Sequence, residues 1–520
     1  MPLRSVSLFG WVHDQVARKR VGLIAALCVC LAVALSAWLV SSPVGSATDD
    51  DFHLASIYCA SSAPAQYCQP QNGQYAVPIE IWQASYCYRG QYPGQSASCQ
   101  DLNLSGQTQL LSPGQVNKTS SYPGGFYWVM GFFAGGDVQA SVFVMGAASI
   151  FLAVIGIVGA LSIAPPNIRQ AGGIGFLVAA NPFGWFLIPS TNPSSWTLLG
   201  IGLYWVLLLT HLLTESEWRR WVSGGGAIVL AGLACMARAD AGPMLIVLDL
   251  AVGILVYRRR LSAPRLRSAG IIVVWSLIVT AWSLLISGQA SASSGAIGGN
   301  IGGNVVAVTG RGLNSLIFNL VNLPQYVFGV FGYAEMGWLN VTHVGSEIPL
   351  SVPILATMLI GALLFVGFSQ YSRSIMLAWL LVVVAIMAYP GWIWFSTKTA
   401  YPSIMQPRYV LPLLPAAIGI PFLRSSTSDQ VRFATLQRWA WWGACLAIFS
   451  ISLYWNIERY SAGLQPTTVP NSIDLSNGAT WWPIPVVSPM EMWGLATAAA
   501  GVGLYLSMPF FFGGNEPDRP

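Results

Sequence analysis

The stretch that decides the fold reads Arg18-Lys19-Arg20, then an apolar run from Val21 to Val40, then Thr48-Asp49-Asp50-Asp51-Phe52-His53. The apolar run is long enough to cross a bilayer as one helix. Because basic residues concentrate on the cytoplasmic side of membranes, its basic flank predicts a cytoplasmic N-terminus and an exterior acidic triplet. Three carboxylates and a histidine therefore open the first exterior loop.

Composition extends this interpretation to the whole chain. Of 520 residues, 54% are hydrophobic and only 8% are charged, which is too few charges to cover a soluble protein of this size. We therefore predict an all-α integral membrane protein in which residues 1–520 form a single polytopic domain. About twelve apolar runs are expected to span the membrane, near residues 21–41, 138–163, 171–190, 196–214, 222–237, 243–257, 269–288, 350–369, 375–396, 409–424, 439–456 and 490–511.

A further apolar stretch, from Leu313 to Ala334, would reverse the side of every later loop if it crossed the membrane. We interpret it as an interfacial or re-entrant helix broken at Pro324. About 17 of the 24 lysines and arginines are then cytoplasmic, and about 12 of the 19 acids are exterior. The cytoplasmic connections are short and leave no room for a nucleotide-binding domain. The long connections are exterior, at 42–137, 289–349, 397–408 and 457–489.

Four cysteines, Cys59, Cys68, Cys87 and Cys99, lie in the first exterior loop. An even number of cysteines in an oxidising compartment predicts two disulfides. Four cysteines allow three connectivities, and we expect Cys59 to pair with Cys68 and Cys87 with Cys99. A zinc site is the weaker alternative, because the spacings match no ligand pattern and His53 is the only imidazole nearby.

The acidic triplet has a structural and a chemical interpretation. It could simply cap a loop helix that starts near Phe52, although three acids exceed what a cap needs. Alternatively, one carboxylate could act as a general base on an incoming hydroxyl. Three carboxylates in one cleft cannot all ionise easily, so one would have a raised pKa or be neutralised by a cation. Basic residues that could pair with these carboxylates occur in the other exterior segments: Arg238, Lys398, Arg408 and Arg459.

Three short motifs follow one another along the chain. They are Asp49-Asp50-Asp51-Phe52-His53, Tyr122-Pro123-Gly124-Gly125-Phe126-Tyr127 and Gln406-Pro407-Arg408-Tyr409-Val410-Leu411-Pro412. Together they resemble the GT-C superfamily of polyprenyl-phosphate-sugar-dependent glycosyltransferases, and in particular a bacterial branch with Asp-Glu-x-x-His, Tyr-Pro-Pro-x-x-Tyr and Gly-Arg-Tyr-x-x-Pro elements. Here Asp50 stands in place of the glutamate, Gly124 in place of a proline and Pro407 in place of the glycine. These departures leave the base open between Asp49 and Asp50.

The resemblance implies a GT-C-like enzyme of the bacterial plasma membrane with its active site on the exterior face. It would transfer a sugar from a polyprenyl-phosphate donor to a hydroxyl of an exterior cell-envelope glycan or lipid-linked acceptor, with inversion. Membrane lipid would surround it, and no nucleic acid and no certain cofactor is expected, although three close carboxylates could hold a divalent cation. The expected catalytic residues are Asp49, Asp50 and Asp51. The expected substrate-binding residues are His53, Tyr122, Tyr127, Arg238, Lys398, Arg408 and Tyr409.

Several of these residues also have simpler interpretations. Arg408 could extend to the membrane surface, and Arg238 could form a structural ion pair with Asp240. The run Thr191-Asn192-Pro193-Ser194-Ser195 could hold a phosphate or only cap the next span. Asp249, inside a span, could have a function or form a hydrogen bond between helices.

Two other functional classes remain open. A transporter or flippase of lipid-linked sugars suits the number of spans, but it would be expected to carry polar groups at mid-membrane and two related halves. The chain shows no internal repeat. The third possible function is that of a non-catalytic membrane protein in envelope assembly.

Overall fold

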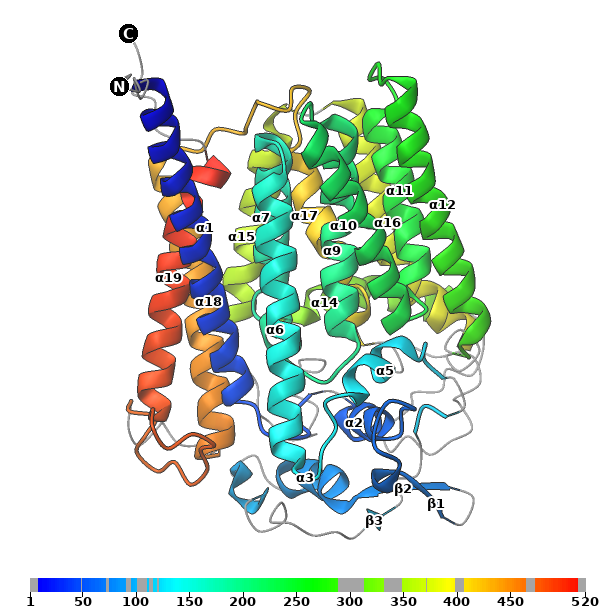
Figure 1. Cartoon of the computed structure of the whole chain (residues 1–520), viewed down its shortest axis with the longest axis vertical. Coiled ribbons are helices and arrows are strands. Elements are labelled where there is room, and N and C mark those ends of the chain that lie inside the picture. Colours follow the sequence, from blue (N-terminus) through cyan, green and yellow to red (C-terminus); the bar gives the residue numbers. More distant parts are fainter. Residues whose placement is uncertain are drawn as a thin grey trace, which may run out of the picture.

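The computed structural model describes residues 8–47, 49–71, 74–89, 95–100, 110–111, 116–118, 121–288, 313–331, 348–370, 372–397, 406–463 and 473–512. Its long helices stand side by side as a bundle, and a smaller layer of short helices and strands lies against one end of that bundle (Figure 1). The expected all-α membrane fold is confirmed by this helical bundle. Lys398, one of the expected substrate-binding residues, lies outside the described residues.

Ten of the twelve expected apolar runs each correspond to one helix of the bundle. Eight of the described helices are long and apolar enough to cross a membrane, and three apolar segments are shorter. The helices are α1 (Leu8–Val40), α6 (Val138–Ile163), α7 (Pro166–Ala180), α8 (Phe183–Leu187), α9 (Ser194–Leu213), α10 (Glu217–Ala237), α11 (Ala241–Val256), α12 (Ala263–Ile286), α15 (Ser351–Gly367), α16 (Arg373–Thr397), α17 (Leu414–Gly419), α18 (Thr435–Ser461) and α19 (Pro489–Phe512).

Helix α9 is the centre of the bundle, because 94% of its most apolar window is buried inside the protein. It packs closely on α10 at Gly200, where an added Cβ would lie 2.7 Å from the Cβ of Ala234. Asp249 of α11 accepts hydrogen bonds from Tyr204 of α9 (2.7 Å) and Ser276 of α12 (2.5 Å). The interpretation of Asp249 as a hydrogen-bonding link between helices is confirmed.

Proline divides two of the expected spans. The run at 171–190 is not one helix, because α7 ends before Asn181-Pro182 and α8 begins after it. Proline lacks an N–H and disfavours helical backbone in the residue before it. The run at 409–424 is a succession of short turns, η7 (Pro407–Tyr409), η8 (Leu411–Leu413), α17 and η9 (Ile420–Phe422).

The apolar stretch from Leu313 forms α14 (Leu313–Phe328), followed by η4 (Gly329–Phe331). The expected break at Pro324 is wrong, because the helix continues through that residue. The reason lies in the packing on both sides of the proline: Leu323 and Tyr326 are buried, and the Tyr326 ring contacts Trp394 of α16 edge to face at 5.3 Å. The α-helix ends at Phe328 instead.

The smaller layer follows α1 and contains the first loop. Its helices are α2 (Asp50–Tyr58), η1 (Ala65–Tyr67), α3 (Ile79–Arg89), η2 (Ala97–Cys99) and α5 (Gly125–Gly131). A three-stranded antiparallel sheet, in the order β1-β2-β3, joins β1 (Gln69–Gln71), β2 (Gln74–Pro78) and β3 (Leu110–Leu111). Gln69 pairs with Ala76, and Val77 pairs with Leu111. The sheet was not expected from the sequence, because strands this short give no alternating pattern.

This layer has a small apolar core of its own. Leu54 and Ile57 from α2, Ile81 from α3 and Phe126 from α5 are fully buried in it. Trp196, in the first turn of α9, completes the core with an edge-to-face contact to Phe126 at 5.1 Å. Ala237, at the end of α10, belongs to the same cluster. The layer is therefore fixed to the bundle by the ends of two central helices.

Both expected disulfides are present, Cys59–Cys68 and Cys87–Cys99. The second disulfide holds η2 against α3. Side chains of this linked segment bind the chain that leaves α1. The Tyr88 hydroxyl and the Gln100 side-chain amide both donate to the carbonyl of Val44, at 2.8 and 2.7 Å. Arg459 of α18 donates to the Tyr88 carbonyl at 2.9 Å. The start of the first loop is thus held between α18 and the disulfide-linked segment.

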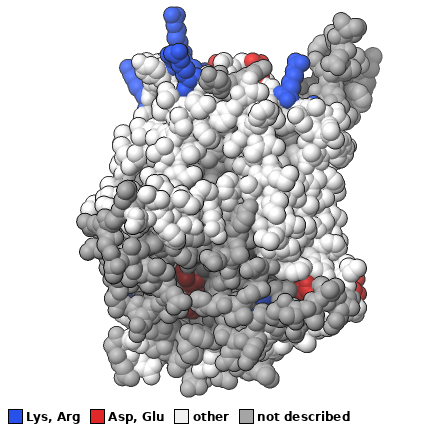
Figure 2. All heavy atoms as spheres, turned by 180° about the vertical axis from the view of Figure 1, so that it is seen from behind, with Lys and Arg blue, Asp and Glu red and all other residues white. Residues whose placement is uncertain are grey.

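Charge differs between the two ends of the bundle. Lysine and arginine side chains project from the end where α1 begins and α19 ends (Figure 2). The opposite end carries the layer with the acidic triplet (Figure 1). This asymmetry agrees with a cytoplasmic N-terminus and an exterior first loop.

Candidate active site

Four separate segments meet where the smaller layer joins the bundle. They are the start of α2, the turn before α9, the turn after α10 and the chain at Gln406–Tyr409. Side chains from all four are joined by hydrogen bonds or ion pairs, described below, although up to 359 positions separate them in the sequence. The candidate site therefore exists only when the fold brings these four distant segments together.

Asp49 and Arg408 form an ion pair at the centre of this junction. Asp49 has left-handed backbone angles, φ 57° and ψ 27°, and its side chain makes no capping bond to α2. The interpretation of this carboxylate as a helix cap is therefore wrong. The Asp49 side chain is 43% exposed, whereas that of Arg408 is only 2% exposed. The pair joins a carboxylate open to solvent with a guanidinium enclosed by protein.

The other two acids have different surroundings. Asp50 is 3% exposed and accepts a hydrogen bond from the Thr191 hydroxyl. Asp51 is partly buried on the first turn of α2. Asp49 and Asp50 thus face different partners.

Arg408 is enclosed and does not extend to a membrane surface, so the interpretation as an interfacial side chain is wrong. It donates to the side-chain oxygen of Gln406 as well as to Asp49. Its Nε is buried and has no partner among the residues that the structure describes. The Tyr326 hydroxyl donates to the Gln406 carbonyl at 2.8 Å and fixes the chain just before the arginine.

Arg238 forms the expected structural ion pair with Asp240. Its Nε and Nη2 donate to the two carboxylate oxygens at 2.9 and 2.7 Å. Nη1 donates to Ser194 at 3.2 Å, and the Tyr389 hydroxyl donates to Asp240 at 3.1 Å. The pair therefore connects the turn after α10 to α9 and α16.

The ring of Tyr409 lies close to both guanidinium groups. Its ring centre is 4.5 Å from the Arg238 guanidinium carbon and 5.2 Å from that of Arg408. Arg238 also lies 5.6 Å from the ring of Tyr122. Cations are attracted to the faces of aromatic rings at such distances. The two arginines thus converge on one aromatic ring from different segments.

His53, Tyr127 and Tyr122 pack against one another at this junction. Nδ1 of His53 lies 2.8 Å from the Tyr127 hydroxyl, and its ring contacts Tyr122 edge to face at 5.2 Å. Burial lowers the pKa of His53 to about 3. The charge of Asp49 acts to raise this pKa, and that of Arg408 acts to lower it. Burial also raises the pKa of Tyr127 well above its ordinary value. The imidazole is neutral and the phenol protonated at physiological pH.

His53 is expected to make the protein less stable as pH falls below about 6.5, where a free imidazole takes up a proton. Because its folded-state pKa is about 3, the unfolded chain binds more protons between these two values. The contribution of neutral His53 to the free energy of unfolding is complete above about pH 6.5 and falls by up to about 1.4 kcal/mol per unit below it.

Thermal unfolding in detergent at about pH 7.5 and about pH 5 measures this loss. Acidification should cost the wild type about 2 kcal/mol more than it costs His53→Gln. An equal loss in both proteins would contradict a neutral, buried His53.

Two further tyrosines at this junction, Tyr326 and Tyr389, were not expected from the sequence. Each lies within an apolar helix and gives no motif, although a buried phenol generally finds a hydrogen-bond partner. The Thr191–Ser195 run binds side chains: Thr191 donates to Asp50, and Ser194 accepts from Arg238. Within the described part of the chain, no group of three or more His, Cys, Asp or Glu side chains could hold a metal ion.

Comparison with known proteins gives one family and two solved structures. The model of a family described as predicted membrane protein (DUF2142) matches residues 30–417. The chain is also similar to ArnT from Cupriavidus metallidurans in the apo state, with 13% identity, a TM-score of 0.39, and coverage of 93% of this chain and 77% of that one. For ArnT bound to undecaprenyl phosphate, the identity and TM-score are the same and the coverage is 98% and 78%. No curated protein matches the chain significantly.

Proposed function

The chain belongs to the DUF2142 family of predicted membrane proteins, and from this premise we propose that it is a membrane glycosyltransferase. It would move a sugar from a polyprenyl-phosphate donor to a hydroxyl of an exterior glycan or lipid-linked acceptor. Two things support the proposal: the motif resemblance to the GT-C superfamily, and the meeting of the first and third motifs in space.

The observation that carries the proposal is the ion pair between Asp49 and Arg408. A sugar transfer of this kind needs a base for the acceptor hydroxyl and a cation for the departing phosphate, a few ångströms apart. The exposed carboxylate and the enclosed guanidinium supply these two groups.

Asp49 is the base in this mechanism. Its side chain is the exposed partner of the pair, whereas Asp50 is buried against Thr191. Asp49 takes the proton from the acceptor hydroxyl as that oxygen attacks the anomeric carbon on the side opposite the phosphate. The bond from the anomeric carbon to the phosphate oxygen breaks, its electron pair leaves with the polyprenyl phosphate, and the configuration of the sugar is inverted.

Arg408 holds the phosphate in this mechanism. A guanidinium can bind two phosphate oxygens at once, and burial strengthens that interaction because water is excluded. The arriving phosphate competes with Asp49 for Arg408. Donor binding would therefore release the carboxylate from its partner at the moment when it is needed as a base.

Arg238 supports the donor site through its contact with the ring of Tyr409. Because Asp240 already satisfies two of its nitrogens, Arg238 fixes the aromatic ring more than it adds free positive charge. His53 holds Tyr127 in place through its contact with the Tyr127 hydroxyl. Lys398 is proposed as a further donor contact on sequence grounds alone.

The test is a transfer assay with purified protein in proteoliposomes. A panel of polyprenyl-phosphate pentoses and hexoses, each labelled in the sugar, would be supplied with a cell-envelope glycan fraction. We expect label in the acceptor and unlabelled polyprenyl phosphate as the second product. If the protein carried donors between leaflets without any transfer, the flippase alternative would replace this proposal.

A further inference from the structure

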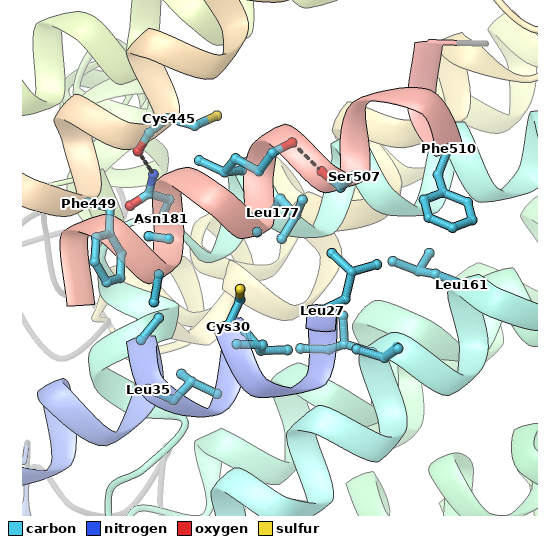
Figure 3. Close-up of a pocket in the computed structure, with 18 of the residues that line it drawn as sticks. Leu27, Cys30, Leu35, Leu161, Leu177, Asn181, Cys445, Phe449, Ser507 and Phe510 are labelled. Carbon is cyan, nitrogen blue, oxygen red and sulfur yellow. Dashed lines mark hydrogen bonds between the residues drawn. The ribbon is translucent and has the colours of Figure 1, made fainter. Parts of the chain in front are cut away.

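A cavity of about 130 Å³ lies inside the bundle, between α1, α6, α7, α18 and α19 (Figure 3). Its wall is almost entirely apolar, with Leu31, Leu161, Phe449 and Leu504 among the lining side chains. Apolar cavities of roughly this size stay dry and admit apolar guests. The cavity therefore suits hydrocarbon and does not suit a sugar.

Arg169 marks one end of this cavity. It donates to the carbonyls of Leu161 and Ala164, both at 2.9 Å, and its guanidinium carbon lies 5.2 Å from the Phe510 ring centre. Leu161 and Phe510 are at one end of the cavity, and Phe449 is at the other (Figure 3). Nη1 of Arg169 makes no hydrogen bond within the described part of the chain.

The arginine at this end has other arginines as electrostatic neighbours. Arg20 and Arg219 act on Arg169, with no carboxylate among the groups that do so in the described residues. Nε of Arg219 is buried and lacks a partner there. Like charges repel at short range, and an anion among them would relieve that repulsion and take up the remaining donors.

We propose that the cavity and these three arginines bind an anionic glycerophospholipid from the leaflet at the arginine-rich end of the bundle. Part of one acyl chain occupies the cavity, and the phosphate lies against Arg169, Arg20 and Arg219. Basic pockets between membrane helices on the cytoplasmic side bind anionic head groups in this way. The site is independent of the proposed sugar transfer, because Asp49 and Arg408 lie at the opposite end of the bundle.

Native mass spectrometry of protein released from nanodiscs tests the site. The nanodiscs would contain equal amounts of phosphatidylglycerol, which is anionic, and phosphatidylcholine, which is zwitterionic. We expect the wild type to retain phosphatidylglycerol preferentially. Arg219→Gln should retain about fivefold less of it, the effect of one arginine near a membrane surface. The matched control is Arg220→Gln on the same helix, because Arg220 already pairs with Glu217 at 3.3 Å.

A second pair of variants tests the cavity itself. Ala500→Phe places a ring where Ala500 lines the cavity, and should abolish lipid retention. Val502→Phe on the same helix is the control, because Val502 is 50% exposed on the surface of the bundle. Equal retention of the two lipids by the wild type would overturn the proposal, as would unchanged retention in both Arg219→Gln and Ala500→Phe.

Cysteine labelling gives an answer in the wild-type protein. Cys30 lines the cavity and Cys28, two positions away on α1, does not. Phosphatidylglycerol should slow the reaction of Cys30 with N-ethylmaleimide severalfold and leave the rate at Cys28 unchanged, whereas phosphatidylcholine should change neither. Equal protection of both thiols would mean that lipid only covers the outer surface of α1, and would also reject the site.

Discussion

Replacing Asp49 by asparagine is expected to lower the rate of sugar transfer by about 10²- to 10⁴-fold, the usual contribution of a general base. The amide has nearly the shape of the carboxylate but cannot accept the proton of the acceptor hydroxyl. The measurement is the initial rate of labelled sugar transfer in proteoliposomes, at saturating donor. Donor binding should survive, because the phosphate is held by Arg408 and not by Asp49.

The neighbouring acids provide the matched controls. Asp51→Asn removes the same charge two positions away and should leave the rate within a few-fold of wild type. Asp50→Asn keeps an oxygen that can accept the bond from Thr191, so its effect is expected to be smaller than that of Asp49→Asn. If Asp49→Asn retained full activity while Asp50→Asn lost it, the base would be Asp50 and the assignment made here would be wrong.

Arg408→Lys is expected to reduce transfer by about 10²- to 10³-fold, comparable to the removal of one preorganised donor from a transition-state site. A lysine keeps the charge but cannot make two parallel hydrogen bonds to a phosphate. It would also lose the simultaneous contacts to Gln406 and Asp49. In the same assay, the maximal rate should fall and the donor concentration needed to reach half of it should rise.

Arg459→Lys is the control for loss of a buried arginine. Arg459 is 2% exposed and donates to the carbonyls of Gln95 and Tyr88, without contact to the candidate site. The substitution should weaken the attachment of the first loop, which would lower the unfolding temperature. Sugar transfer by the protein that remains folded should change little. Wild-type transfer by Arg408→Lys would remove this residue from the proposed mechanism.

Much of the fold follows from local features of the sequence. Apolar runs of sufficient length predicted the bundle helices, and four cysteines near one another predicted both disulfides. The sequence assigned the acidic triplet and Arg408 to one active site, and in the fold Asp49 and Arg408 form an ion pair. Whether these residues act in catalysis stays a prediction.

Other features could not be read from the chain because they depend on contacts between distant segments. The backbone angles of Asp49 separate its carboxylate from that of Asp50, and three consecutive identical letters give no sign of this. The contact of the Tyr409 ring with both arginines requires the turn after α10 to reach Gln406–Tyr409. Hydropathy also predicted one helix at 409–424, because it measures how apolar a segment is and does not register the backbone donors lost at Pro412, Pro415 and Pro421.

The core of the smaller layer has a consequence for biogenesis. Leu54 and Phe126 are packed with Trp196 and Ala237, which are made much later during translation. The first loop therefore cannot complete its core when it emerges from the ribosome. It has to wait until α9 and α10 have been synthesised and inserted, and until then its apolar side chains lack their final neighbours. The acidic motif is thus among the first parts of the chain to be synthesised, but the site around Asp49 assembles late.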